Sequence, residues 1–247
     1  MTGAAAGIGW ATAKCFASHG DTVVVLDLDE AQAVKRAEEL GAISAQPHAG
    51  FGLDVSCETA VVPTILAIIQ QWGRIDVLVN NAGIGDQAVS TVNQSFDGFK
   101  KLLDVHLSGT YLMSREVAKA MMDKGSGSIV NLSSIAATGG IPGRNAYGAA
   151  KAGIAAMTRS MACEWAAQGI RVNAVAPGYV RTELVEKLIA NGALDTAKIE
   201  RRTPMGRLAH PDEIAKTIYF LASPDASYIT GATLAVDGGW AALGAAI

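Results

Sequence analysis

The sequence predicts an α/β fold in which a doubly wound parallel sheet carries helices on both faces. Strand-like and helix-like segments alternate along the 247 residues, and such alternation is typical of parallel strands joined by helical crossovers. Half of the residues are hydrophobic and 17% are charged, so a large core is available. Glycine and alanine are abundant, which favours close packing of helices on a sheet. We expect a single domain over residues 1–247.

The first half of the chain alternates strand and helix. The β-branched run Thr22–Leu28 predicts a strand. The next helix, Asp29–Leu40, opens with Asp29 and Gln32 at the spacing of a capping box, and Gly41 ends it. The segments that follow are a strand over Gly52–Val55, a helix over Ser56–Trp72 and a strand over Ile75–Asn80.

The second half continues the pattern. Phe96–Lys124 is expected to form one long helix that ends at Gly125. The later elements are a strand over Ser128–Ser133, a helix over Ala146–Gln168, a strand over Ile170–Ala176, a helix over Pro211–Ala222 and a strand over Thr233–Val236. The stretch from Thr182 to His210 has no such pattern. We expect it to be an irregular insertion that forms a substrate lid over 182–210.

The opening strand of the sheet is missing or truncated in this sequence. Doubly wound folds place a central strand before the first glycine turn, whereas Met1 stands one residue before that turn. Three interpretations are possible. The chain is a fragment of a longer one, its start codon was assigned too late, or the sheet forms without this strand. The first two interpretations fit better, because a missing central strand would leave backbone groups of its neighbours unpaired.

Charge and cysteine content exclude several functional classes. The net charge is −3 and the isoelectric point is near 5.8, which argues against a nucleic-acid partner or a basic membrane surface. Cys15, Cys57 and Cys163 are far apart and show no metal or redox spacing, which fits a reducing cytoplasm. No apolar run is long enough to span a membrane, and no signal segment opens the chain. We expect a small-molecule substrate and no metal.

A glycine-rich turn at the start indicates a dinucleotide site. Gly3, Gly7 and Gly9 give G-x-x-x-G-x-G, a variant of the Rossmann fingerprint G-x-G-x-x-G. Such glycines allow close backbone approach to a pyrophosphate at a helix N-terminus. The alternative is a glycine-rich turn with no ligand.

Asp27 stands at the end of the next predicted strand, where a carboxylate accepts both ribose hydroxyls and repels a 2′-phosphate. No Arg or Lys lies in the glycine turn or just after Asp27. The pattern therefore favours NAD over NADP, unless Asp27 is an ordinary acid at a strand end.

Two later turns could also face the cofactor. Asp54 and Val55 could lie beside the adenine, or Asp54 could instead cap the backbone near Ser56. Asn81, Ala82 and Gly83 follow a buried strand and could hold a backbone turn against the cofactor. Their alternative role is a structural turn at the strand end.

Ser134, Tyr147 and Lys151 suggest acid–base chemistry. Tyr147 and Lys151 are four residues apart on a predicted helix, so they share one face. A free phenol has a pKa near 10, and a lysine one turn away favours the phenolate. The Ser134 hydroxyl can hold a substrate oxygen near the phenol. Taken alone, Tyr147 and Lys151 could be a surface helix pair.

In combination these motifs resemble the short-chain dehydrogenase/reductase family, over nearly the whole chain. The motifs are Thr2-Gly3-(x)3-Gly7-Ile8-Gly9, Asn80-Asn81-Ala82-Gly83, Ser134, Tyr147-(x)3-Lys151, Pro177-Gly178 and Thr182. The resemblance implies Tyr147 as general acid/base, Ser134 as anchor of the substrate oxygen, and Lys151 as modulator of the phenol and ligand of the nicotinamide ribose. It also implies that Val180 and Thr182 contact the nicotinamide carboxamide.

The expected cofactor-binding residues are Gly3, Gly7, Ile8, Gly9, Asp27, Leu28, Asp54, Val55, Asn81, Ala82, Gly83, Tyr147, Lys151, Pro177, Gly178, Val180 and Thr182. The resemblance further implies a homotetramer or homodimer. One interface would use the helices Phe96–Lys124 and Ala146–Gln168, and another would use the region of Thr233–Val236.

His106 departs from the family, which usually has asparagine in Leu103-Asp104-Val105-His106-Leu107-Ser108-Gly109. That asparagine is thought to hold a water that links the lysine to solvent. We hypothesise that His106 serves the same relay as a catalytic residue and adds pH sensitivity near pH 7. The alternative is a tolerated substitution that only satisfies a helix kink.

The substrate is the least determined feature. Gly140, Arg144 and Tyr179 could line its pocket, together with Ser134 and Tyr147; Arg144 could instead be a surface or interface residue. The first expectation is an NAD-dependent oxidoreductase that interconverts a secondary alcohol, such as a polyol, and its ketone. The alternatives are a 3-oxoacyl-thioester reductase and, in another class, an inactive NAD-binding module or half of a fused protein.

Overall fold

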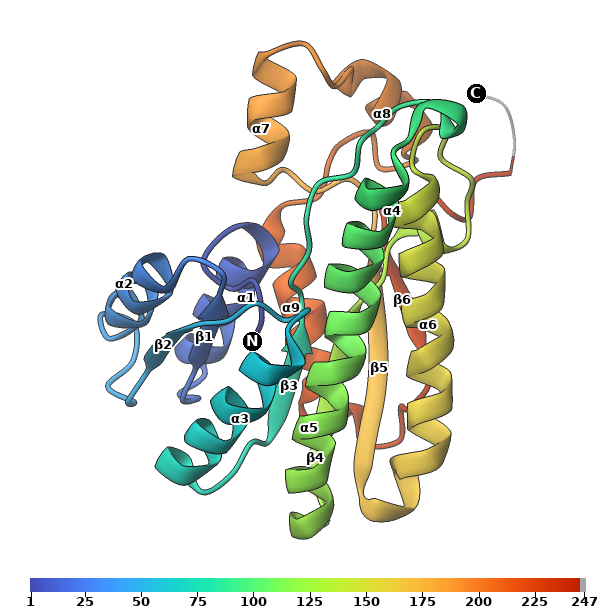
Figure 1. The fold of residues 1–247 in the computed structure, drawn as a ribbon. Helices are drawn as coiled ribbons and strands as arrows, with labels where there is room; N and C mark the ends of the chain where they lie inside the picture. Colours follow the sequence, from blue (N-terminus) through green and yellow to red (C-terminus); the bar gives the residue numbers. More distant parts are fainter. Residues whose placement is uncertain (245–247) are drawn as a thin grey trace.

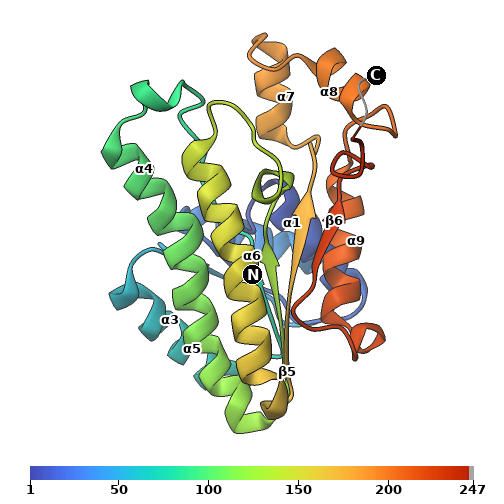
Figure 2. The ribbon, with the colours of Figure 1, turned by 90° about the vertical axis from the view of Figure 1, so that its right-hand side faces the viewer.

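A parallel sheet lies between two layers of helices in the computed structural model, which describes residues 1–244 (Figures 1 and 2). The strands are β1 Val24–Asp27, β2 Ala49–Gly52, β3 Val77–Asn80, β4 Gly127–Leu132, β5 Ile170–Pro177 and β6 Thr233–Val236. β2 pairs with β1, and β3, β4, β5 and β6 pair in that order. Every pairing is parallel, which confirms the predicted doubly wound α/β fold.

Met1 and Thr2 occupy the position between β1 and β3. The Leu26 amide donates to the Met1 carbonyl at 2.9 Å and the Thr2 amide donates to the Val79 carbonyl at 3.0 Å. Thr2 also forms a parallel bridge with Leu26. These two residues therefore join the β1 and β3 portions of the sheet.

Helices cover both faces of the sheet. One layer contains α1 Gly7–Ser18, α2 Glu30–Leu40 and α9 Pro211–Ala222. The other contains α3 Glu58–Trp72, α4 Phe96–Leu103, α5 Gly109–Lys124 and α6 Asn145–Trp165. Figure 2 shows α1 and α9 on one side of the strands and α5 and α6 on the other. Among the described residues, no helix combines the length and the apolarity that a membrane span requires.

Neighbouring residues of a strand pack into the two hydrophobic cores on opposite faces of the sheet. Val25 packs with α1, α2 and α9, whereas Leu26 packs with α3 and α5. Ile129 and Val130 of β4 divide in the same way. Strand side chains alternate between faces, so a sheet covered on both sides needs continuous apolar strands. This is the pattern by which the sequence predicted the strands.

The second strand lies earlier than expected. β2 covers Ala49–Gly52, whereas the sequence predicted Gly52–Val55. A Cβ added to Gly50 would lie 2.3 Å from the backbone of Ala33 in α2. The glycines of β2 therefore allow α2 to lie directly on this strand, a packing effect that strand propensity does not register.

The predicted single helix over Phe96–Lys124 is interrupted. α4 passes into a π-helical turn, η2 Asp104–Ser108, before α5 begins. π-turns insert an extra residue into a helix and are frequent at functional sites. The predicted helix Ala146–Gln168 is α6 followed by the 3-10 turn η4 Ala166–Gln168.

The stretch Thr182–His210 is not irregular, which corrects the prediction. It contains α7 Glu183–Ala190 and α8 Thr196–Arg202. The Thr182 hydroxyl accepts from the Val185 amide, and the Asp195 carboxylate accepts from the Lys198 amide. Each is an N-cap. The two helices rise above the carboxyl end of the sheet (Figure 1).

Candidate active site

The glycine turn between Thr2 and α1 has little room for side chains. Gly3 and Gly7 have φ values of +57° and +54°, in the left-handed region that favours glycine. A Cβ on Gly9 would lie 2.2 Å from the Gly3 carbonyl oxygen. Backbone amides at the N-terminus of α1 can therefore approach an anion closely. The residues present would fit a dinucleotide pyrophosphate at this turn.

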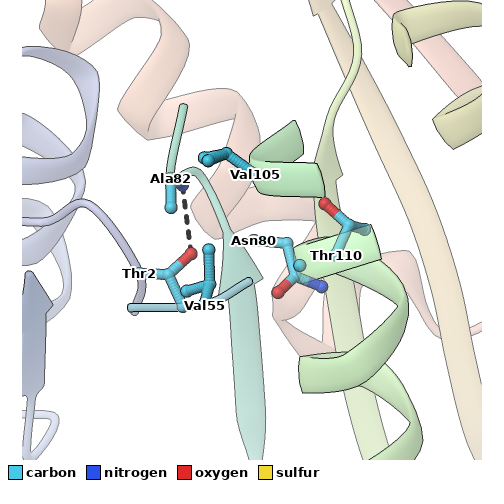
Figure 3. Close-up of a pocket in the computed structure, with 7 residues that line it drawn as sticks. Thr2, Val55, Asn80, Ala82, Val105 and Thr110 are labelled. Atoms are coloured by element: carbon cyan, nitrogen blue, oxygen red, sulfur yellow. Dashed lines mark hydrogen bonds between the residues drawn. The ribbon is translucent and has the colours of Figure 1, made fainter. Parts of the chain in front are cut away.

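The loop after β3 is tied to this turn. The Asn81 side-chain amide donates to the Thr2 and Gly3 carbonyl oxygens at 3.1 and 2.7 Å. The Thr2 hydroxyl accepts from the backbone amides of Asn81 and Ala82. Figure 3 shows the bond from Ala82 to Thr2 beside Val55. Asn81 and Ala82 therefore hold the glycine turn in place.

Asp27 and Arg36 hold opposite ends of Ala5 within the turn. The Asp27 carboxylate accepts from the Ala5 amide at 3.0 Å, and the Arg36 Nε donates to the Ala5 carbonyl at 2.9 Å. Arg36 also stacks over Trp10, with the guanidinium carbon 4.5 Å from the ring centroid. Sequence inspection missed Arg36, because it looked for cations only in the turn and just after Asp27. Packing of α2 beside α1 brings it there.

The other predicted residues near the adenine differ in their surroundings. Leu28, directly after Asp27, is 75% exposed, so an apolar surface is available beside β1. Val55 is buried. The Asp54 carboxylate accepts from the amide and the hydroxyl of Ser56 at 2.9 and 2.6 Å. The capping role that the sequence left open for Asp54 is therefore the one seen here.

Gly178 and Thr182 reach the site from the end of β5. A Cβ on Gly7 would touch the Thr182 methyl group at 3.4 Å, so the glycine turn and the start of α7 are neighbours. The Gly178 amide donates to Val236 of β6 at 3.1 Å. Val180 is buried and bridges to Ala209. Pro177 ends β5.

Ser134, Tyr147 and Lys151 come together where β4 meets α6. The Lys151 ammonium lies 5.4 Å from the centre of the Tyr147 ring and donates to the Leu132 carbonyl at 2.6 Å. The neighbouring Ser133 hydroxyl donates to the Lys151 carbonyl at 3.0 Å, which ties the end of β4 to α6. The Ser134 hydroxyl lies close enough to the Tyr147 phenol to lower the pKa of that phenol. The predicted constellation is therefore assembled.

Burial dominates the pKa values of this cluster. It lowers the pKa of the Lys151 ammonium to about 7, because the charged form is poorly solvated. Burial also raises the pKa of Tyr147, and the nearby Ser134 hydroxyl and the charge of Arg144 only partly oppose this rise. The expected lowering of the phenol pKa by Lys151 is therefore not seen in the protein alone.

His106 is 3% exposed and lies in the π-turn η2. Its ring stands edge-on to Tyr147 with centroids 5.5 Å apart. Its Nε2 lies 3.0 Å from both the amide nitrogen and the carbonyl oxygen of Ile84, and its Nδ1 is buried without a partner. Burial and then the charge of Lys151 lower its pKa to about 4. The ring is therefore neutral at pH 7, which corrects the expected pH sensitivity near neutrality.

Gly83 packs directly against this imidazole. A Cβ on Gly83 would lie 2.4 Å from the His106 Cε1. Glycine at position 83 therefore accommodates the histidine, and the two residues fix the exit of the chain from β3.

The predicted substrate residues differ in their surroundings. Gly140 is exposed, with open space where a Cβ would stand. Arg144 precedes α6 and its charge acts on the Tyr147 phenol. Tyr179 lies instead beside Trp240, in a cavity of about 340 Å³ between the 203–213 and 235–239 segments. Ser134 and Tyr147 do not line that cavity. No metal-binding cluster of His, Cys, Asp and Glu occurs within residues 1–244.

Comparison with known proteins gives consistent matches over nearly the full chain. A family model described as enoyl-(acyl carrier protein) reductase matches residues 3–241. The short-chain type dehydrogenase/reductase y4vI of Sinorhizobium fredii is 48% identical over 97% of this chain and 43% of its own length. The chain belongs to the short-chain dehydrogenase/reductase family. It spans less than half of that relative.

Other members of the short-chain dehydrogenase/reductase family align over most of their own length. The 3-oxoacyl-[acyl-carrier-protein] reductase of Thermotoga maritima is 40% identical over 97% of this chain and 95% of its own. D-threitol dehydrogenase of Mycolicibacterium smegmatis is 40% identical over 97% and 91%. The crystal structure of levodione reductase superimposes with a TM-score of 0.93 at 32% identity, over 98% of this chain and 96% of that one. The chain is therefore an oxidoreductase of a family that uses nicotinamide cofactors.

Proposed function

We propose that this protein is an NAD-dependent oxidoreductase that interconverts a secondary alcohol of a polyol or similar hydroxy compound and its ketone. The observation that carries the proposal is the assembly of Ser134, Tyr147 and Lys151 at the carboxyl edge of the sheet, near the turn formed by Gly3, Gly7 and Gly9. When bound, the nicotinamide would accept or deliver the hydride.

The side chains of this cluster would handle the proton. Ser134 holds the substrate oxygen against the Tyr147 phenol, which takes or returns its proton. Lys151 lies 5.4 Å from the phenol ring, and its positive charge favours the phenolate when the site binds its ligands. Its pKa of about 7 allows it to hold or release a proton at neutral pH. We propose His106 as a neutral partner in the relay from Lys151 to solvent.

The preference for NAD rests on Asp27. Its carboxylate lies against the glycine turn, where it can accept from ribose hydroxyls and would repel a 2′-phosphate. The exposed Leu28 side chain offers an apolar surface to the adenine. The guanidinium of Arg36 is engaged with Ala5, Glu39 and Trp10, so it is not a free cation that would favour NADP.

Two alternatives stay open. Similarity to the Thermotoga reductase favours a 3-oxoacyl-thioester reductase, whereas similarity to D-threitol dehydrogenase favours a polyol. Because the chain spans 43% of the Sinorhizobium relative, it could also act as half of a fused protein or as an inactive NAD-binding module.

We further propose a single domain in a cytoplasmic homotetramer or homodimer, with 182–210 as the substrate lid.

Cofactor titration and one variant test the proposal. We expect NADH to bind at least about tenfold more tightly than NADPH in calorimetry, since the 2′-phosphate meets an anion. Tyr147→Phe should keep NADH affinity and lose about 10²- to 10⁴-fold in turnover. Tyr228→Phe, at a fully exposed tyrosine, is the matched control. Full turnover in Tyr147→Phe would contradict the assignment, and equal affinity for both cofactors would contradict the role of Asp27.

A further inference from the structure

Asp86 carries an unpaired carboxylate oxygen inside the protein. Its Oδ1 accepts from the Gln87 amide at 2.7 Å, whereas its Oδ2 is buried and has no hydrogen-bond partner. Within residues 1–244 it is the only carboxylate oxygen in this condition. A buried unpaired acceptor on a charged group costs free energy unless a donor reaches it. The structure around Asp86 supplies none.

The loop that carries Asp86 lies against the loop before α6, because a Cβ added to Gly143 would stand 3.4 Å from the carbonyl carbon of Ala88 and the carbonyl oxygen of Val89. Burial is the main cause that raises the pKa of the Tyr147 phenol; the charge of Arg144 opposes the rise and the charge of Asp86 adds to it. Asp86 follows β3 in the chain, and Arg144 immediately precedes the helix that carries Tyr147.

The segment that carries Asp86 has a strained backbone and is hydrogen-bonded to the loop before α6. Ala88 has a φ of +51°. It is the only non-glycine residue of the described chain with a positive φ. Such strain persists only where the surroundings impose it, and it is typical of functional sites. The Gln94 side-chain amide donates to Val89 and to Gly143. This contact fixes the segment beside Arg144.

From these contacts we infer that Asp86 is a specificity-determining residue that accepts a hydrogen bond from a second hydroxyl of the substrate, close to the carbon that reacts at Tyr147. The inference rests on the proposed function and narrows its substrate class to vicinal diols and polyols. A substrate hydroxyl would supply the donor that Oδ2 lacks. An acyl chain offers no such donor and would leave the carboxylate unpaired.

Two alcohols that differ by one hydroxyl test the inference. We would measure kcat/KM with NAD for 2,3-butanediol and for 2-butanol. The wild type should favour the diol by about 10- to 100-fold, since a site built to bind a hydroxyl rejects the analogue that lacks it. Asp86→Ala should remove most of this preference, and Asp86→Asn should reduce it. Activity on 2-butanol should change far less than activity on the diol.

The ratio of kcat/KM for 2,3-butanediol to kcat/KM for 2-butanol separates recognition of the second hydroxyl from catalysis. Asp86 also influences the Tyr147 pKa, but that effect acts on both alcohols and cancels in the ratio. Asp97→Asn is the matched control, because this carboxylate is 92% exposed and pairs only with Lys100; it should leave the ratio unchanged.

Three outcomes would overturn the inference. These are a wild type with no preference for the diol, equal losses on both alcohols in the Asp86 variants, and a wild type that binds NADH yet oxidises neither alcohol. Absence of NADH binding to the wild type would contradict the proposed function itself, so the two failures are distinguishable.

Discussion

At the scale of single residues, burial rather than sequence spacing sets the chemistry. The spacing of Tyr147 and Lys151 predicted that they would meet, and they do. It could not predict that burial raises the pKa of Tyr147 and lowers that of Lys151 to about 7, because burial depends on how the rest of the chain packs. Asp86 and Arg36 escaped sequence inspection for the same reason, since neither belongs to a motif.

His106 should make the fold sensitive to acid. Its pKa is about 4 in the folded protein against 6.5 as the unperturbed value. The unfolded chain therefore binds more protons between these values, and stability rises with pH across that window. About 3 kcal/mol should be lost as pH falls from 6.5 to 4. The facing charged group is Lys151, and the Tyr147 ring lies edge-on to the imidazole.

Urea unfolding of the wild type and His106→Asn at pH 7.5, 5 and 4 checks this prediction. Asparagine does not titrate, so the variant should lose less stability on acidification than the wild type does. Parallel losses in the two proteins would show that other groups cause the acid sensitivity.

At the scale of elements, the glycine turn shows how a local pattern and a distant contact combine. The positions of Gly3, Gly7 and Gly9 predicted the turn from sequence alone. Only the fold places the Asn81 amide on its carbonyls and the Asp27 carboxylate on its Ala5 amide. The same limit explains β2, whose glycine-rich sequence is a strand because α2 packs onto it.

Gly9→Ala should abolish the cofactor cradle. The added Cβ would stand 2.2 Å from the Gly3 carbonyl oxygen, so the turn must shift, at a cost of about 1–3 kcal/mol. We expect NADH affinity to fall at least about tenfold in calorimetry, with a lower melting temperature. Gly244→Ala, where a Cβ meets open space, is the control. Wild-type NADH affinity in Gly9→Ala would show that the cofactor lies elsewhere.

At the scale of the whole molecule, one edge of the sheet remains open. β6 is an edge strand of the described sheet, and its Leu234 is 40% exposed. Exposed edge strands with apolar residues favour association. This agrees with the proposed interface around Thr233–Val236, and α5 and α6, which lie side by side (Figure 2), offer the other proposed interface.

Leu234→Glu should reduce the size of the oligomer. A charge on this edge would be buried without a partner in the assembled form, so light scattering should show a smaller particle at micromolar concentration. Leu66→Glu, at a 61% exposed position on α3, is the control. An unchanged mass in Leu234→Glu would contradict the proposed interface at β6.

The sequence by itself determined the doubly wound α/β class, the glycine turn, and the trio of Ser134, Tyr147 and Lys151. These features depend on residues close together in the chain or on periodicities of two and 3.6 residues. The tertiary structure alone decided how Met1 and Thr2 join β1 to β3, where the π-turn at His106 falls, and that the loop after Asp86 lies against the loop before α6. Those features depend on contacts between segments that are distant in the chain, and local sequence patterns do not predict which distant segments will pack together.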